Sequence, residues 1–411
     1  MSVTYRQVFQ VGEFRTLFVS MMVSVTGDQF ARVALSLLIF DRTRSAGWTA
    51  VTYALTYLPS VLAGPLLSGL ADRWPRRRVM IVADLLRAAL VALMAIPGLA
   101  LPIAVALLVL VQAAGAPGNA ARAATAAAAL PDEQYVLGKG ALDTIVQLSQ
   151  VVGFATGGAL VAGAGPATAL LSDGASFLVS AAVVRLGVRE RPAPSTTVSD
   201  AAIQAGVLAR WRRDLVDGSR LVARTPKLRS LVALAAVAGF YVSVEGLAAP
   251  YAAQIGGSAD AVGVLLAASP AGAVLGMALI TRLRPQVRSQ LLGPLAIAAC
   301  VPLVMCLARP RLAVTAVLWL LSGVASAYHL PASAEFTLAV PDHRRAQAYG
   351  LAATVLMTSQ GLGIALAGLA ATVVAPSAAL AGTGGLGVVA AGLAGAAWNR
   401  ARRALPAEQA G

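Results

Sequence analysis

Carboxyl and guanidinium groups lie inside several long apolar runs of this sequence, where ionised side chains are costly and usually have a function. Asp28 and Arg32 stand one helical turn apart near the middle of the first run, and Glu245 stands in the run Leu231–Tyr251, which contains no basic residue. A carboxyl group inside a membrane can carry a proton, so Asp28 and Glu245 are candidates for proton coupling. A structural pair between Asp28 and Arg32 is the alternative that the spacing allows.

Six further polar side chains could line a cavity for a small molecule. Two glutamines recur at helical spacing in one run, and a stripe of this kind must face protein or water rather than lipid. Tyr241 lies one turn before Glu245, and an adjacent Tyr-His pair lies in a later run. Aromatic residues at such positions are as often core or interfacial residues. The candidates for the cavity lining are Arg32, Gln147, Gln150, Tyr241, Tyr328 and His329.

Three other ionisable residues in apolar runs have simpler interpretations. Asp84 and Arg87 lie near one end of a predicted helix, and we expect them to form a structural pair. Asp173 is assigned to helix packing or capping.

The sequence lacks the residue sets of common enzymes and metal sites. Gly138-Lys139 is followed by Gly140, not by the Ser or Thr that completes a phosphate-binding loop. Cys300 and Cys306 lie on one predicted helix, which argues against a disulfide or a metal site. We therefore expect no catalytic residue, no metal and no cofactor, and we keep an intramembrane enzyme only as an alternative.

The elements that must position these side chains are membrane-spanning helices. Of the 411 residues, 58% are hydrophobic and 12% are charged, which is about half the charged fraction of a soluble domain. A bilayer core of about 30 Å requires about 20 apolar residues per helix. The fold class is therefore an all-α membrane protein with twelve transmembrane helices. The predicted spans are residues 16–40, 47–70, 79–98, 102–124, 139–162, 167–186, 229–252, 259–281, 290–308, 312–335, 346–372 and 376–398.

The basic residues predict the orientation of these helices. The chain has 32 Lys and Arg residues and a net charge of +14. With the N-terminus inside, 25 of them face the cytoplasm, four lie outside and three lie within helices. This bias follows the positive-inside rule, so the charge does not indicate nucleic acid. We expect a multi-pass protein of the inner (plasma) membrane, with both termini cytoplasmic and an uncleaved first helix. The basic residues expected outside are Arg42, Arg44, Arg309 and Arg311.

The turn between the second and third predicted helices carries a charged motif. From Ser68 to Arg77 it reads Ser-Gly-Leu-Ala-Asp-Arg-Trp-Pro-Arg-Arg. This motif resembles the cytoplasmic loop of the major facilitator superfamily, Gly-x-Leu-Ala-Asp-Arg-x-Gly-Arg-Lys/Arg, with both glycines replaced. The resemblance implies a gating loop that closes the inner face by contacts with the eleventh helix. The residues implied are Asp72, Arg73, Arg76 and Arg77.

Further stretches resemble one branch of this superfamily, which includes macrolide efflux proteins and siderophore (enterobactin) exporters. The resemblance covers nearly the whole chain. One element, Gly153-Phe154-Ala155-Thr156-Gly157-Gly158, is similar to the Gly-Pro-x-x-Gly-Gly element of antiporters, with Phe154 in place of the proline; close helix packing is an equally good explanation of its glycines. The other stretches are Phe14-Arg15-Thr16-Leu17, Gly27-Asp28, Asp41-Arg42-Thr43 and the spacing from Arg122 to Pro131.

The chain contains an internal repeat. Residues 131–158 align without gaps on residues 341–368 at an offset of 210, which pairs Gly153 with Gly363. The repeat indicates a parallel duplication. Two six-helix halves related in this way, with a transport site between them at the midplane, are what the superfamily resemblance implies. The predicted domains are the bundles 1–186 and 228–400, a cytoplasmic linker at 187–227 with a short amphipathic basic helix, and a cytoplasmic tail at 401–411.

These features predict a secondary active transporter that works by alternating access. The resemblance implies proton-coupled efflux of an amphipathic small molecule, such as a drug, an antibiotic or a siderophore-like compound. The alternatives are a uniporter or importer of a small solute and, outside transport, an intramembrane enzyme or a scaffold. Expected partners are the small-molecule substrate, the proton and the lipid bilayer, with no nucleic acid, and we expect a monomer. A fold shared by many transporters does not identify the substrate.

Overall fold

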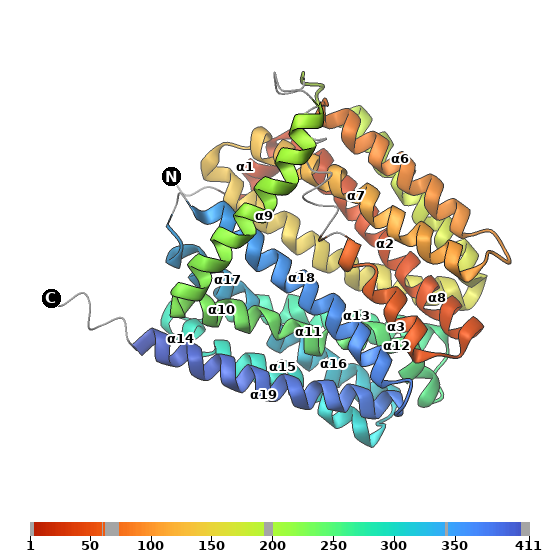
Figure 1. Ribbon diagram of the computed structural model, residues 1–411. Helices are drawn as coiled ribbons and strands as arrows, with labels where there is room; N and C mark the ends of the chain where they lie inside the picture. The colour runs from red at the N-terminus through yellow and green to blue at the C-terminus, as the bar shows by residue number, and fades with distance from the viewer. Residues whose placement is uncertain (1–3, 60, 62–73, 193–199, 342–343, 404–411) are drawn as a thin grey trace. The chain divides into compact units, whose positions relative to one another are not determined.

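The computed structural model describes residues 4–59, 61, 74–192, 200–341 and 344–403 (Figure 1). Over these ranges the backbone forms helices and connecting turns, without a strand. Asp72 and Arg73 of the predicted gating loop lie outside the described residues, as do parts of the predicted linker and tail.

The chain divides into two compact units. Unit 1 contains residues 1–39 and 58–208, and unit 2 contains residues 40–57 and 209–411. The first division falls within the last turn of a long helix, so the short helix that follows it belongs with the C-terminal helices. The boundaries of the two six-helix bundles, at residues 186 and 228, remain a prediction.

Unit 1 consists mainly of long helices. α6 packs along both α7 and α8, and α1 packs on α8. Gly165, at φ 82° and ψ 167°, and Pro166 interrupt α8, so this element contains two of the predicted spans joined by a kink. The helices are α1 (Tyr5–Gln10), α2 (Gly12–Thr43), α6 (Arg76–Met94), α7 (Leu101–Ala129) and α8 (Asp132–Gly187).

Over the described residues, unit 2 contains more helices than unit 1, and most of them are shorter. α13 packs along α16, α15 packs along α19, and α3 packs on α12 and α18 (Figure 1). The linker helix α9 (Asp200–Arg224) crosses the division between the units. The helices are α3 (Ala46–Ala54), α10 (Pro226–Ala236), α11 (Ala238–Tyr241), α12 (Ser243–Gln254), α13 (Ala259–Ile280), α14 (Pro285–Gln290), α15 (Leu292–Met305), α16 (Leu312–Ser326), α17 (His329–Ala339), α18 (Arg345–Ala370) and α19 (Pro376–Arg403).

The helices are long and apolar enough for a membrane protein. Among the described residues, eight helical segments could cross a bilayer by length and hydropathy. One of them, Leu137–Gly187, contains two predicted spans, and the apolar segment Leu292–Ala308 is shorter. The all-α fold class predicted from the apolar runs is confirmed.

Two predicted spans in unit 2 are interrupted near their middles. One is divided into α10, α11 and α12 at Val237 and Val242, and the other into α16 and α17 at Ala327 and Tyr328. Pro331 helps to explain the second interruption, because its ring clashes with the carbonyl four residues earlier in a regular helix. Carbonyl groups at such junctions need other partners inside a membrane. The Tyr328 hydroxyl supplies one by donating to the carbonyl oxygen of Leu234 at 2.8 Å.

The internal repeat appears as two equivalent helix crossings. In unit 1, a Cβ atom on Gly153 of α8 would lie 2.8 Å from the Cβ of Gln29 on α2. In unit 2, a Cβ atom on Gly363 of α18 would collide with the carbonyl oxygen of Gly239 on α11. Gln29 and Gly239 are separated by the same 210 positions as Gly153 and Gly363. The glycines therefore serve close helix packing in both halves.

Candidate functional site

Asp28 forms an ion pair between two helices of unit 1. Its Oδ1 accepts a hydrogen bond from Nη2 of Arg87, from α2 to α6, at 2.7 Å. The Arg87 side chain is 6% exposed and that of Asp28 is 25% exposed. The guanidinium group also lies over the ring of Phe177, 4.0 Å from its centroid. Gly115 of α7 leaves room for Arg87, because a Cβ atom there would lie 3.4 Å from its Nε.

A second carboxyl group, that of Asp173, lies beside this pair. Asp173 is 1% exposed and interacts electrostatically with Asp28, Arg87 and Arg32. Its Oδ2 is buried and has no hydrogen-bond partner among the described residues. The sequence assigned Asp173 to packing or capping and did not connect it with Asp28. The four residues Asp28, Arg32, Arg87 and Asp173 are named the Asp28 cluster.

Asp84 and Arg122 form another buried pair in unit 1. Nη2 of Arg122 lies 2.6 Å from Oδ2 of Asp84, and the two side chains are 5% and 2% exposed. Ser180 of α8 donates to the same carboxylate at 2.7 Å and lies 2.8 Å from the hydroxyl of Ser20 on α2. The predicted pair between Asp84 and Arg87 was therefore wrong. Residues three apart on α6 are neighbours, but each of these two is paired with a residue on a different helix.

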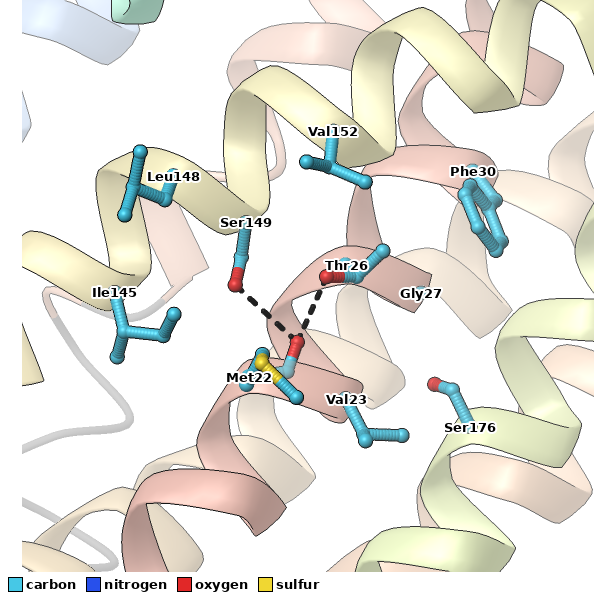
Figure 2. Close-up of a pocket in the computed structure, with 10 residues that line it drawn as sticks. All are labelled: Met22, Val23, Thr26, Gly27, Phe30, Ile145, Leu148, Ser149, Val152 and Ser176. Carbon is cyan, nitrogen blue, oxygen red and sulfur yellow. Dashed lines mark hydrogen bonds between the residues drawn. The ribbon is translucent and has the colours of Figure 1, made fainter. Parts of the chain in front are cut away.

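An apolar cavity of about 380 Å³ lies next to the Asp28 cluster. Figure 2 shows its walls, which come from α2 and from both halves of α8. Thr26 and Ser149 both donate to the carbonyl oxygen of Met22, at 2.8 and 3.3 Å, so these hydroxyls bind backbone. Gly27 and Ser176 connect the cavity to the cluster, since Gly27 precedes Asp28 and Ser176 donates to the carbonyl oxygen of Asp173 at 2.7 Å. The lining residues are Met22, Val23, Thr26, Gly27, Phe30, Ile145, Leu148, Ser149, Val152 and Ser176.

Glu245 lies in unit 2, in the first turn of α12. Its Oε2 accepts a hydrogen bond from the Tyr57 hydroxyl at 2.6 Å. The following residue, Gly246, allows close packing, because a Cβ atom there would lie 3.1 Å from the Cβ of Ala50 on α3. The sequence analysis identified Glu245 as a candidate for proton coupling but did not identify Tyr57 as its partner. Nothing in the local pattern could reveal a partner 188 residues away.

Three of the candidate cavity residues meet at the helix interruptions of unit 2. The Tyr241 hydroxyl lies 2.7 Å from Nε2 of His329, and the rings of Tyr328 and His329 stack with centroids 4.4 Å apart. Tyr241 is 6% exposed and Tyr328 is fully buried. The three residues form one polar group, in which Tyr241 and Tyr328 are buried and His329 is half-buried. Their predicted role in lining a cavity remains a prediction.

Of the other candidates, Arg32 of α2 is half-buried and belongs to the Asp28 cluster. Gln147 and Gln150 of α8 are half-buried and lie outside that cluster. Two arginines of the predicted gating loop contact other parts of unit 1. Nη1 of Arg76 donates to the carbonyl oxygen of Ala124 at 3.0 Å, and Nη1 of Arg77 lies 3.6 Å from Oε2 of Glu190. The gating role of the loop remains a prediction.

The family model described as Major Facilitator Superfamily matches residues 17–308. This chain belongs to the major facilitator superfamily. The sequence prediction of the family is therefore confirmed, and so are the predicted transporter class and the expectation that the protein is not an enzyme.

Relatives within the superfamily include two named "Multidrug efflux pump Tap". The chain is 29% identical to the protein from Mycobacterium tuberculosis (strain ATCC 25618 / H37Rv) in an alignment of 251 residues, and the match covers 58% of this chain and 57% of the relative. It thus spans just over half the length of that relative. It is 26% identical to the protein from Mycolicibacterium fortuitum in an alignment of 378 residues, and the match covers 87% of this chain and 88% of the relative.

Solved structures of other transporters show the same superfamily fold. A bacterial homologue of the human lysosomal transporter Spinster superposes with a TM-score of 0.73 at 17% identity, covering 98% of both chains. The peptide transporter POT superposes with a TM-score of 0.74 at 14% identity, covering 98% of this chain and 99% of that one. At these identities the likeness concerns the fold alone.

Proposed function

We propose that this transporter exports an amphipathic small molecule in exchange for protons, by alternating access. Membership of the superfamily makes the protein a membrane-embedded transporter with a small-molecule substrate. The observation that carries the proposal is the Asp28 cluster beside the apolar cavity of unit 1. The Asp28 cluster offers charged groups that can bind a proton or a polar group of the substrate, and the cavity offers apolar surface. The names of the relatives support efflux as the direction.

The Asp28 cluster has the groups that proton coupling requires. In the described structure Asp28 is held by Arg87, and Asp173 adds a second carboxyl group within electrostatic range. Interacting carboxyl groups take up and release protons as a coupled set. In this proposal a proton on Asp28 weakens its bond to Arg87, and a substrate that competes for the same groups favours proton release. Glu245, bound to Tyr57, is the second candidate carrier.

The cavity favours an apolar substrate moiety. Its wall is formed mainly by side chains such as Phe30, Leu148 and Val152. The hydroxyls of Thr26 and Ser176 donate to backbone carbonyls, so they offer little to a sugar-like solute. Burial of apolar surface contributes about 25 cal/mol per Å². The substrate class that fits is therefore a molecule with an apolar body and one polar or charged group.

Transport in proteoliposomes tests this function. Liposomes with an acidic lumen should accumulate an amphipathic dye against its gradient while protons leave, and a protonophore should abolish the accumulation. A hydrophilic sugar serves as the control and should not move. Movement of the dye only down its own gradient, unaffected by the protonophore, would support the uniporter alternative and contradict the proposal.

The proposal includes cytoplasmic termini and a monomeric chain. A single cysteine at Ser219, in the exposed part of α9, should label from the inside, and one at the exposed Ser258 should label from the outside. The background must lack Cys300 and Cys306. An impermeant thiol reagent applied to intact cells and to inside-out vesicles makes the measurement. Labelling of both positions from the same side would contradict the twelve-helix topology.

A further inference from the structure

A groove between α6 and α7 of unit 1 is separate from the Asp28 cluster. It measures about 470 Å³, and none of its lining residues belongs to that cluster. Val82 and Leu86 on its wall are 62% and 48% exposed. Trp74 and Arg78 line the part at the N-terminal end of α6, and the rest of the lining is apolar: Val79, Ile81, Val82, Ala83, Leu86, Ala114 and Pro117.

The sequence of α7 explains why this groove exists. Residues 113–118 read Ala-Ala-Gly-Ala-Pro-Gly and contain no side chain larger than the proline ring. Pro117 also has no amide proton, so the helix loses one of its own hydrogen bonds there. The opposing face of α6 carries larger aliphatic side chains. A depression lined by methyl groups follows from this pairing of small and large residues.

The mouth of the groove is basic. Arg76, Arg77 and Arg78 follow one another, and Arg77 donates to the carbonyl oxygen of Arg185. Glu190 is the acid that binds here, accepting from Nε of Arg78 at 2.7 Å. In the contacts of the described residues, Arg78 uses only Nε, and its side chain is 65% exposed. The two Nη groups can therefore donate to an anion.

We propose that this groove binds an anionic phospholipid, with one acyl chain along α6 and α7 and the phosphate at Arg78. An outward apolar surface of a membrane-embedded helix meets acyl chains, and Trp74, 58% exposed, has the amphipathic ring that is enriched at the membrane interface. Excess positive charge at the mouth selects anionic headgroups over zwitterionic ones. With the predicted topology, the mouth faces the inner leaflet.

Tryptophan quenching by brominated lipids tests this site in the purified full-length protein. Phosphatidylglycerol with brominated chains is the probe, and phosphatidylcholine with the same chains is the zwitterionic control. The chain has five tryptophans, so Trp74→Phe identifies the share of the signal that comes from Trp74. Emission from the buried Trp319 and Trp398 reports that each variant is folded. We expect Trp74 to be half-quenched at a concentration of phosphatidylglycerol about fivefold lower than of phosphatidylcholine.

Matched variants separate charge from packing. Arg78→Gln should remove the preference for phosphatidylglycerol, and Arg78→Lys should keep it. Glu190→Gln breaks the same ion pair but leaves the arginine, so it should keep the preference as well. Ala114→Leu fills the groove and should weaken both lipids about tenfold, whereas Ala106→Leu, on an exposed position of α7, should weaken neither.

Three results would overturn the proposal. One is equal quenching of Trp74 by the two lipids in the unmodified protein, which indicates ordinary surrounding lipid. Another is loss of the preference in Glu190→Gln to the same extent as in Arg78→Gln, which assigns the effect to the ion pair. The third is equal weakening by Ala106→Leu and Ala114→Leu.

Discussion

Asp28→Asn is expected to reduce proton-driven substrate accumulation to the level of protein-free liposomes while substrate counterflow continues. An asparagine can still accept a hydrogen bond from Arg87, so the packing of α2 against α6 is kept. The asparagine side chain cannot take up or release a proton, so the proton gradient can no longer drive transport through this residue. Counterflow needs only alternating access and measures whether the variant remains folded and mobile.

Two companion variants make this test specific. Glu245→Gln removes the other candidate carboxyl group, which binds Tyr57. Asp143→Asn is the matched control, because Asp143 forms an exposed pair with Lys139 at 3.0 Å, with side chains 67% and 58% exposed. We expect the control to keep gradient-driven transport. If Asp28→Asn and Glu245→Gln both keep it too, neither residue carries the coupling proton.

Arg122→Met is expected to destabilise the protein by about 3–5 kcal/mol, because it leaves Asp84 buried without its cation. The pair is among the most buried in the described part of unit 1, and Ser180 alone cannot replace the guanidinium group. The double variant Asp84→Leu/Arg122→Met removes both charges and should recover most of the lost stability. Thermal unfolding in detergent, followed by tryptophan emission, measures Arg122→Met, Asp84→Leu and the double variant.

An exposed pair provides the control for this cycle. Lys139→Met breaks the contact with Asp143 and should change stability by less than about 1 kcal/mol. If the double variant is as unstable as the sum of Arg122→Met and Asp84→Leu, the two residues are not coupled. The pair would then have no role beyond the space that its members fill.

The helices were predictable because each membrane-spanning helix requires a continuous apolar run of about 20 residues in the sequence. The run 346–372 corresponds to α18 at Arg345–Ala370, and the gap between the runs 139–162 and 167–186 falls at the kink of α8. The interruptions at Val237 and Val242 were not foreseen. No proline lies at those junctions, and the apolar pattern continues across them.

The sequence identified the unusual ionisable residues more readily than it identified their partners. An apolar run marks Asp28 as unusual, but its partner Arg87 lies on a different helix and depends on how α2 and α6 pack. Spacing along one helix suggested Arg32 as the partner of Asp28, and Arg87 as the partner of Asp84. In the folded protein, Asp84 is instead paired with Arg122 of α7. Asp173 was missed for the same reason, since its proximity to Asp28 arises only in the folded unit.

The repeat predicts packing better than chemistry. The crossing at Gly153 and Gln29 recurs at Gly363 and Gly239. At the same offset, however, Asp28 corresponds to Ala238 and Arg87 to Ile297. The two halves therefore share this helix crossing but not the charges of Asp28 and Arg87, and the Asp28 cluster has no counterpart at the equivalent positions of unit 2.

The contact between Gly363 and Gly239 has a mechanical consequence. The two backbones touch without side chains between them. If α11 and α18 slid past each other, their backbones would clash, and if they separated, they would leave a void. The two helices should therefore move together as one rigid unit. The junctions at Val237 and Val242 flank α11 on both sides. Bending of this span is therefore expected to occur at those two residues, which would act as hinges.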